Sequence, residues 1–381
     1  MSMFKLDDEH LELQASFREF AQNEVKPLAK EIDETARFPL ETVKKLAEMG
    51  MLGLPYPEEY GGAGIDQLTY VLAVEELGKV CGSTAIIASV HTSLCSWPIY
   101  KFGTEEQKQK YLTGLASGQK LGAFALTEPN AGTDASMQKS TAVLEGDHYV
   151  LNGNKVFITN APYADYFVVF AMTNKELGTK GISAFILEKG MEGFTVGKPE
   201  KKMGVRAANA AELVFDNVKV PVENRLGDEG RGFKIAMATL DGGRIGVAAQ
   251  AVGLAQGAID EAVKYTAERI QFGKRISQFQ NTQFTLADMQ TKTDAARLLV
   301  WRAADAMQNG EPYSALAAEA KLFAAETASY VTNRAVQLMG GYGYTSAYPV
   351  ERMMRDAKVT EIYEGTSEVQ KMVISGTMGV K

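Results

Sequence analysis

Apolar residues at helical spacing dominate the first third of the chain. Over about the first 120 residues they recur three or four positions apart, as Leu13 and Phe17 do, so they share one face of an α-helix. Residues 68–77 and 85–95 are apolar almost throughout, which is typical of helices buried on several faces. The pattern predicts a helical N-terminal domain over residues 1–122.

After Gly122 the spacing changes to that of β-strands. Short runs rich in Val, Ile, Phe and Tyr alternate with turn residues, as in small β-domains. Gly146-Asp147 and Asn152-Gly153 suit hairpin turns, because these residue types tolerate positive φ. We therefore expect an antiparallel barrel or sandwich over residues 123–230. The expected strands cover residues 123–126, 141–144, 149–151, 155–159, 167–171, 182–187 and 212–214.

Long alanine-rich helices are predicted from Gly232 onward. With short connections they bury their apolar stripes most simply in an antiparallel four-helix bundle over residues 231–381. Small residues at Gly246, Gly253 and Gly257 would let these helices approach closely. Long faces without charge either pack inside the chain or meet another subunit, and the sequence leaves both open. The expected helices cover residues 233–269, 282–308 and 313–339, with a shorter pair after Pro349.

Composition narrows the possible functions. The 381 residues include 40 Lys and Arg against 47 Asp and Glu, a net charge of −7, with no basic block to neutralise a phosphate backbone, so nucleic acid is not an expected partner. Two cysteines and three scattered histidines are too few for a Cys/His zinc site or a disulfide framework. No apolar stretch is long enough to span a bilayer, and the first residues do not resemble a signal peptide. We therefore expect a cytoplasmic protein without a membrane span.

Several common catalytic motifs are absent from the sequence. It holds no G-x-G-x-x-G after a strand, no P-loop, no H-E-x-x-H and no G-x-S-x-G. Nicotinamide-binding Rossmann, NTPase, zincin and α/β-hydrolase interpretations therefore lose their support. The chemistry must rest on carboxylates, hydroxyls, amides or an organic cofactor.

Two segments at predicted strand ends are candidates for a ligand site. Residues 126–134, L-T-E-P-N-A-G-T-D, turn through Pro, Asn and Gly and offer backbone N–H groups and two hydroxyls. Such groups suit the polar edge of a flat ring or a phosphate. Residues 157–160, F-I-T-N, add an aromatic ring and a hydroxyl. Each segment also has a plain structural interpretation, as a surface turn and a strand end.

A carboxylate near the C-terminus is a second kind of candidate. Glu364 lies between Tyr363 and Gly365, where the helical pattern breaks, so the backbone can bring its side chain close to a ligand. The structural alternative makes Glu364 the end of one helix and Thr366 or Ser367 the cap of the next.

Two glycine pairs also stand out. Gly242 and Gly243 lie inside a predicted helix between Asp241 and Arg244, where each costs roughly 1 kcal/mol relative to alanine. Another group is therefore expected to approach that backbone. Residues 337–343, Q-L-M-G-G-Y-G, form either a helix C-cap with a turn or a place that admits a cofactor's pyrophosphate.

In their order and spacing, these segments resemble the acyl-CoA dehydrogenase family, and the similarity runs along essentially the whole chain. It is greatest to the short-chain, butyryl-CoA-type branch. The resemblance implies an α+β multidomain fold with an N-terminal helical domain, a central β-domain and a C-terminal four-helix bundle. It also implies a homotetramer, a dimer of dimers, with FAD between domains and subunits. The motifs that carry it are L-T-E-P-N-A-G-T-D, F-I-T-N, L-D-G-G-R-I-G-V-A-A-Q, R-I-Q-F-G-K, Q-L-M-G-G-Y-G-Y and I-Y-E-G-T-S-E.

The resemblance further implies a role for individual residues, with Glu364 as the general base. The flavin ring and nearby groups would contact Phe124, Ala125, Leu126, Thr127, Thr133, Phe157, Ile158 and Thr159, with Thr366, Ser367 and Glu368 covering the flavin. The FAD of a neighbouring subunit would contact Arg269, Gln280, Gln337, Leu338, Met339, Gly340 and Gly341. The substrate would contact Thr133, Asp241, Gly242, Gly243, Arg244 and Gly365.

The reaction that the resemblance implies is α,β-dehydrogenation of a short-chain acyl-CoA, with the electrons passed to electron transfer flavoprotein. Some relatives carry the base at the position of Gly243, which supplies no carboxylate here. Phe157 stands where many relatives have Trp, and Asn130 and Thr133 replace Gly and Ser. The alternatives are a dehydrogenase of branched short acyl-CoAs and a non-catalytic flavin-binding scaffold.

Overall fold

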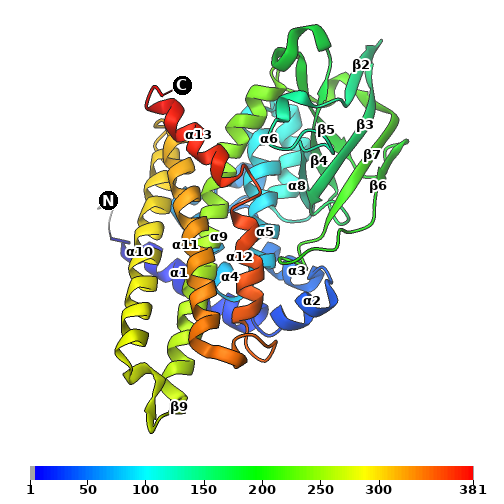
Figure 1. Ribbon diagram of the computed structural model, residues 1–381. Coiled ribbons are helices and arrows are strands. Elements are labelled where there is room, and N and C mark those ends of the chain that lie inside the picture. Colours follow the sequence, from blue (N-terminus) through cyan, green and yellow to red (C-terminus); the bar gives the residue numbers. More distant parts are fainter. Residues whose placement is uncertain (1–4, 381) are drawn as a thin grey trace.

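Helices from the two ends of the chain pack side by side, and a β-sheet lies against one end of them (Figure 1). The computed structural model describes residues 5–380. Residues 1–4, part of the segment considered as a signal peptide, and Lys381 lie outside the described residues. Helix α9 (Gly232–Glu268) runs through the middle of the molecule and contacts helices of both ends.

The N-terminal helices confirm the predicted helical domain. Helix α4 begins after Asp66, whose carboxylate accepts a hydrogen bond from the Thr69 N–H at 2.7 Å and so satisfies a free helix-terminal donor. Helices α4 and α5 and the π-helical segment η3 are almost wholly buried, as their composition predicts. The helices are α1 (Asp8–Phe20), α2 (Ala29–Thr35), α3 (Leu40–Glu48), α4 (Gln67–Val80), α5 (Gly82–Ser89), α6 (Trp97–Phe102), α7 (Glu105–Gln107) and α8 (Thr113–Ala116), with π-helical segments η1 (Ala21–Val25), η3 (Val90–Ser96) and η4 (Lys108–Leu112).

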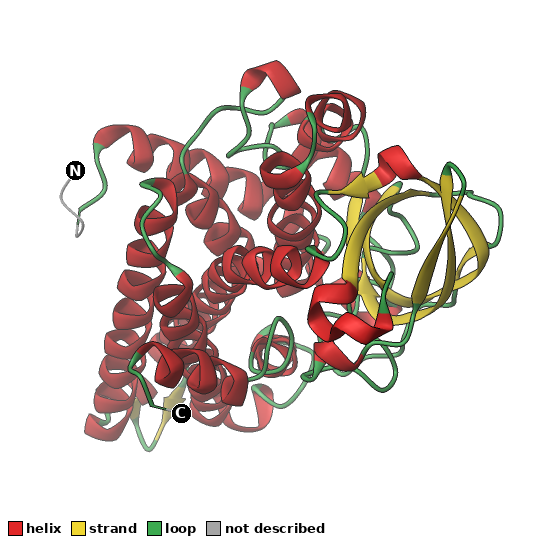
Figure 2. Ribbon diagram, turned by 90° about the horizontal axis from the view of Figure 1, so that it is seen from above, coloured by secondary structure: helices red, strands yellow, loops and turns green. Residues whose placement is uncertain are grey.

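The central strands form one mixed sheet that curves into a barrel beside the helices (Figure 2). Its order is β6-β7-β3-β2-β4-β5-β8, with β1 beside β4. The sheet is not wholly antiparallel, because β1 and β2 both pair in parallel with β4; the chain leaves β1 through a long loop, and no hairpin imposes an antiparallel partner. The strands are β1 (Gly122–Ala125), β2 (Thr141–Glu145), β3 (His148–Thr159), β4 (Tyr166–Met172), β5 (Ile182–Glu188), β6 (Phe194–Val196), β7 (Ala210–Pro221) and β8 (Arg225–Leu226).

One of the two predicted hairpin turns forms. Gly146-Asp147 joins β2 to β3, with Gly146 at φ 64°. The prediction for Asn152-Gly153 is wrong, because these residues lie inside the continuous strand β3, at a register shift against β7. Gly153 is needed there for a different reason. A Cβ atom at this position would lie 2.3 Å from Oγ of Ser140, so the neighbouring chain leaves no room for a side chain.

The C-terminal helices form the expected bundle, and α9 packs tightly on α4. Cβ atoms on Gly253 and Gly257 would lie 2.4 Å and 2.1 Å from the carbonyl oxygens of Glu75 and Lys79. The face of α9 that carries Gly253 and Gly257 therefore packs against α4 of the same chain. A short hairpin between α9 and α10, β9 with β10, has no counterpart in the sequence prediction. The elements are α10 (Gln280–Gln308), α11 (Ser314–Met339), α12 (Val350–Thr360), α13 (Ser367–Thr377), β9 (Ile270–Gln271) and β10 (Lys274–Arg275).

Alternation along the strands divides the apolar side chains between two cores. In β4, Phe167 and Val169 belong to the core inside the barrel, whereas Val168 and Phe170 belong to the larger core shared with the helices. Successive strand residues point to opposite faces, so the sheet packs on both sides. Within residues 5–380, no helix is both long and apolar enough to cross a membrane.

Candidate active site

The turn between α12 and α13 presents Glu364 to helix α9. Glu364 has a φ of 54° and Gly365 a φ of 95°, and a positive φ is uncommon for a residue other than glycine. The turn brings the carboxylate so close to α9 that a Cβ on Gly243 would lie 2.1 Å from Oε2 of Glu364. Leu94 of η3 borders the same space, because its Cδ2 would lie 2.6 Å from that Cβ.

The carboxylate of Glu364 has an unusual environment. Both of its oxygens are buried and have no hydrogen-bond partner among the described residues. Burial raises the pKa of Glu364 to about 8, against the opposing effect of the positive charges of Lys321 and Arg244. Buried polar groups are normally paired, and carboxyl groups with a strongly shifted pKa cluster at functional sites.

Helix α9 contributes an ion pair beside this carboxylate. Nη1 of Arg244 lies 2.6 Å from Oδ1 of Asp241, and burial raises the pKa of Asp241 and lowers that of Arg244. The expected approach to the glycine backbone occurs at Gly243 only, because a Cβ on Gly242 would meet nothing closer than Cε of Met307 at 3.5 Å.

The loop of residues 126–138 is held by a buried lysine that sequence reasoning missed. Lys155 of β3 is fully buried, and its Nζ contacts the Leu126 carbonyl oxygen at 3.0 Å, Oε1 of Glu128 at 2.8 Å and Oε1 of Gln138 at 3.1 Å. The Glu128 carboxylate in turn accepts hydrogen bonds from the N–H groups of Lys139 and Ser140, the two residues that follow the loop. No signal in the sequence pointed to it, because alternation places Lys155 on the strand face opposite Ile158. Both side chains are buried because the register against β7 shifts between these two residues.

The predicted flavin-contacting segments after β1 and in β3 lie side by side. The Val156 N–H donates to the Thr127 carbonyl oxygen at 2.9 Å. Phe157 is 67% exposed at φ 61°, so its ring is available to a ligand. The side chains of other predicted contacts point into the cores and leave only their main-chain groups available. They are Phe124, Ala125, Leu126 and Ile158.

The remaining predicted contacts of this group differ in exposure. Thr133 is exposed on the loop, and Thr159 is half-buried at the end of β3. Thr366 caps α13 through its side chain, and Glu368 is exposed. Ser367 is buried, and its Oγ has no partner among the described residues.

A second group of predicted contacts gathers at the far end of α9. Arg269 and residues 337–341 line one cavity of about 550 Å³, together with Tyr342, whose ring centre lies 5.7 Å from Cζ of Arg269. Gln280, the exposed first residue of α10, does not line it. Gly340 ends α11 at φ 60°. At 1.5 Å per helical residue, Arg269 lies roughly 40 Å from Gly243, so one chain does not bring the two groups together.

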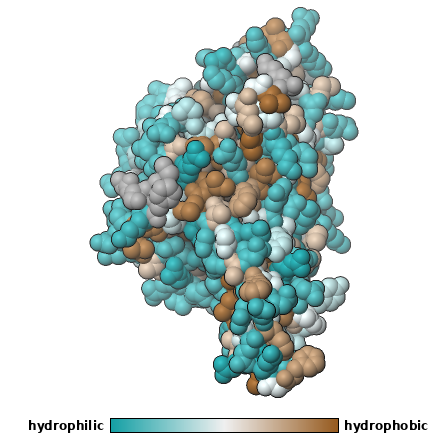
Figure 3. Space-filling model, turned by 60° about the vertical axis from the view of Figure 1, so that its left-hand side comes forward, coloured by the Kyte–Doolittle hydropathy of each residue, from teal (hydrophilic) through white to brown (hydrophobic). Residues whose placement is uncertain are grey.

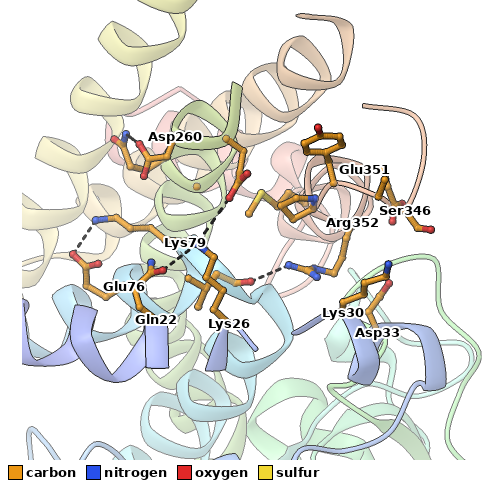
Figure 4. Close-up of a pocket in the computed structure, with 18 of the residues that line it drawn as sticks. Gln22, Lys26, Lys30, Asp33, Glu76, Lys79, Asp260, Ser346, Glu351 and Arg352 are labelled. Atoms are coloured by element: carbon orange, nitrogen blue, oxygen red, sulfur yellow. Dashed lines mark hydrogen bonds and ion pairs between the residues drawn. The ribbon is translucent and has the colours of Figure 1, made fainter. Parts of the chain in front are cut away.

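A further groove holds none of the residues predicted to bind cofactor or substrate. It has a volume of about 460 Å³ and lies between the N-terminal helices, α9 and α12 (Figure 4). Its charged groups largely have partners within the chain: Glu76 lies 3.0 Å from Arg18 and 2.8 Å from Lys79, and Arg352 donates to the Val80 carbonyl oxygen. Within residues 5–380 no group of three or more His, Cys, Asp and Glu side chains could hold a metal ion.

Comparison with known proteins identifies the family. Residues 7–119, 123–218 and 230–379 match the N-terminal, middle and C-terminal domains of acyl-CoA dehydrogenases. The chain is 62% identical to the short-chain specific acyl-CoA dehydrogenase of Clostridium acetobutylicum over 98% of both chains.

Solved structures agree with this assignment. Butyryl-CoA dehydrogenase from Megasphaera elsdenii superposes with a TM-score of 0.97 at 52% identity, over 98% of this chain and 99% of that one. A chain described under "Electron transferring flavoprotein of Acidaminococcus fermentans" gives a TM-score of 0.97 at 56% identity, with the same coverage. The protein with the buried Glu364 carboxylate therefore belongs to the acyl-CoA dehydrogenase family, whose members are oxidoreductases acting on the CH–CH bond.

Proposed function

We propose that this protein is an FAD-dependent short-chain acyl-CoA dehydrogenase that converts butyryl-CoA to crotonyl-CoA, with Glu364 as the general base. The observation that carries the proposal is the buried Glu364 carboxylate, unpartnered among residues 5–380 and directed at the Gly243 backbone. The names of the similar proteins support the substrate class, since they are a short-chain specific acyl-CoA dehydrogenase and a butyryl-CoA dehydrogenase.

The residues present fit an FAD. Phe157 offers an exposed ring, the neighbouring loop offers hydroxyls and main-chain groups, and the buried Oγ of Ser367 has no partner among the described residues. These groups, with Thr366 and Glu368, would hold the flavin. FAD would supply the chemistry that no side chain can, namely acceptance of a hydride from the β-carbon of the substrate.

Glu364 would remove the proton from the α-carbon. A carboxylate is a weak base in water, but burial raises the pKa of Glu364 to about 8, which strengthens the base near neutral pH. The Glu364 N–H would donate to the thioester carbonyl oxygen and so acidify the α-proton. Arg244, whose Nε approaches the Glu364 carbonyl oxygen at 3.5 Å, would hold the substrate together with its ion-pair partner Asp241 and with Gly365.

A homotetramer would complete the cofactor site. The cavity with Arg269 and residues 337–341 lies too far from Glu364 to touch the same flavin, so we assign it, with Gln280, to the FAD of a neighbouring subunit. Figure 3 shows the side of the molecule that lies on the left in Figure 1, and apolar side chains gather on this face. Exposed large apolar residues on the C-terminal elements support an interface formed through these elements. They include Phe272, Phe284, Leu298, Phe323 and Met372.

Electron transfer flavoprotein is the proposed acceptor of the electrons. The sequence has no cysteine cluster for iron–sulfur ligation and no c-type haem motif, so reduced FAD must pass its electrons to another molecule. The similar chain described with an electron transferring flavoprotein supports this partner.

The visible spectrum of the purified protein tests the proposal. We expect a yellow flavoprotein that bleaches when butyryl-CoA is added without oxygen, with slower bleaching by isobutyryl-CoA and by longer straight chains. Fastest bleaching by isobutyryl-CoA would favour a branched-chain enzyme. A flavin that no acyl-CoA bleaches would identify a non-catalytic scaffold.

A further inference from the structure

Three side chains hold the turn that carries Glu364. The Gly365 carbonyl oxygen accepts hydrogen bonds from Nζ of Lys321 at 2.7 Å and from Nε2 of Gln370 at 2.8 Å. Gln370 also donates to the Glu364 carbonyl oxygen at 3.3 Å, and Nε of Arg244 approaches that oxygen at 3.5 Å. The two left-handed residues are thus held from α11, α13 and α9. Such a conformation persists in a folded protein only where the surroundings impose it.

Lys321 is the least expected of the three. It lies in α11, is fully buried, and forms no ion pair within 4.0 Å among residues 5–380. Its hydrogen bond to Gly365 is the one bond of its side chain within those residues. A buried lysine is costly unless it has a partner or a function, and the proposed reaction gives it none.

The positive charge of Lys321 acts on the base. Burial lowers the pKa of Lys321 to about 8, while the negative charge of Glu364 acts in the opposite direction. Reciprocally, Lys321 is the first of the charges that lower the pKa of Glu364 against the effect of burial. Among the described residues, the other charged or titratable groups that act on this pair come from four elements. They are Arg244 of α9, which is paired with Asp241, Tyr70 of α4, Tyr363 in the turn, and Glu361 and Glu368 beside Lys321.

We propose that Lys321 is a positioning residue for the base: its ammonium group holds the Glu364-Gly365 turn through the Gly365 carbonyl and favours the ionised form of the Glu364 carboxyl group. This inference rests on the proposed function of Glu364 as the base. Gln370 shares the first task, because it donates to the same carbonyl oxygen, but it is neutral. Charge and position can therefore be separated by substituting each residue.

Four variants make the separation. Lys321→Met removes both the charge and the hydrogen bond, Lys321→Gln removes the charge and keeps a donor, and Lys321→Arg keeps the charge. Gln370→Met is the matched control, since it removes a neutral donor from the same oxygen. If Lys321→Met does not fold, Lys321→Gln tests the charge alone.

Two readouts apply to each variant. The first is the pH dependence of flavin reduction by butyryl-CoA. The second is infrared titration of the Glu364 carboxyl group without substrate, its C=O band assigned by its loss in Glu364→Gln. Without the Lys321 charge, Glu364 should hold its proton more tightly, so both titrations should move to higher pH by about one unit or more. Lys321→Arg should stay near the wild type, and Gln370→Met should slow reduction without moving either titration.

The outcomes also separate this inference from the proposed function. If no acyl-CoA reduces the flavin, the proposed function fails, yet the infrared titration still reports whether Lys321 sets the protonation of Glu364. Unmoved infrared titrations in Lys321→Gln and Lys321→Met would overturn the inference. An equal shift in Gln370→Met would do so as well, because the effect would then come from position alone.

Discussion

Gly243 and Glu364 compete for one space: a Cβ atom on Gly243 would lie 2.1 Å from Oε2 of Glu364. Only one of these positions can carry a side chain into the site. The geometry thus gives a physical reason why this chain, with a carboxylate at Glu364, has glycine at position 243. A methyl group at Gly243 must displace the carboxylate, since the other neighbour, Leu94, is also closely packed at 2.6 Å.

Gly243→Ala should therefore fold but lose flavin reduction by a factor of about 100 or more, because small misplacements of a reacting group cost this much. Stopped-flow reduction by butyryl-CoA measures the loss. Gly242→Ala is the matched control: its Cβ would meet only the Met307 side chain, at 3.5 Å or more. Any main-chain contact at Gly242 therefore survives, and most of the rate should remain. Equal losses in the two variants would contradict the assignment of the space to Glu364.

Glu364→Gln should retain FAD and bind butyryl-CoA but lose flavin reduction by orders of magnitude. The amide keeps the shape of the side chain and cannot take up the α-proton. Substrate binding is followed by the perturbation of the flavin spectrum, and reduction by its bleaching. Near-normal reduction in this variant would show that another group is the base.

The pH dependence of the reaction follows from the burial of Glu364. Because burial raises its pKa to about 8, the ionised form is lost below that pH, and kcat/KM should fall about tenfold for each further pH unit. The folded state also binds this proton more tightly than the unfolded chain does. This group should therefore make the wild type less stable as pH rises from 4.5 to about 8. The Glu364→Gln variant should not show this contribution. An acid limb near the ordinary glutamate pKa would contradict the buried, unpaired carboxylate.

Sequence reasoning reached the fold and the candidate base through local signals. Helical periodicity, strand runs and glycine turns act over a few residues, so α9 to α13 lie where the spacing placed them. Sequence reasoning failed where contacts between residues far apart in the sequence decide the structure. Gly153 faces Ser140 inside a strand instead of forming a turn. Lys321 was likewise not singled out, because its partner, the Gly365 carbonyl, is far away in the sequence and has no residue-type signature.

Lys155→Met should destabilise the protein by about 3–5 kcal/mol, because it leaves the Glu128 carboxylate buried without its cation. Glu128 is 6% exposed and lies 2.8 Å from Nζ of Lys155. The loop of residues 126–138 should loosen as well, so bound flavin should dissociate faster. Urea unfolding measures the first effect and flavin release the second. The double variant Lys155→Met with Glu128→Gln should recover part of the stability, and no recovery would show that the pair is not the cause.

His10 should make the N-terminal helices more stable in mild acid. Its ring nitrogens lie 2.5 Å from Oδ1 of Asp7 and 3.0 Å from Oδ2 of Asp66, the N-caps of α1 and α4. Burial lowers the pKa of His10, but the hydrogen bond to Asp7 and the charge of Asp66 outweigh it, so the pKa is raised. The stabilisation is fully present below the unfolded value of 6.5 and is lost as pH rises through the raised folded value.

Thermal unfolding of His10→Gln at about pH 6 and about pH 9 checks this sign. The deficit relative to the wild type should be larger in acid. His148→Gln serves as the control, since His148 lies beside one exposed carboxylate, that of Asp147, at a hairpin end. A deficit in His10→Gln that grows toward alkaline pH would contradict the charged bridge.

Arg269→Ala should weaken cofactor retention and subunit assembly together. If the cavity of Arg269 and residues 337–341 binds the FAD of a neighbour, ligand and interface stabilise each other by linkage, and excess FAD should restore the assembly. The ratio of flavin to protein absorbance and light scattering after size exclusion give the two readings. Arg334→Ala is the matched control, because this exposed arginine of α11 lies over the Tyr330 ring at 5.3 Å, much as Arg269 lies over Tyr342, yet does not line the cavity. A stable Arg269→Ala monomer with full flavin content would contradict a cofactor site shared between subunits.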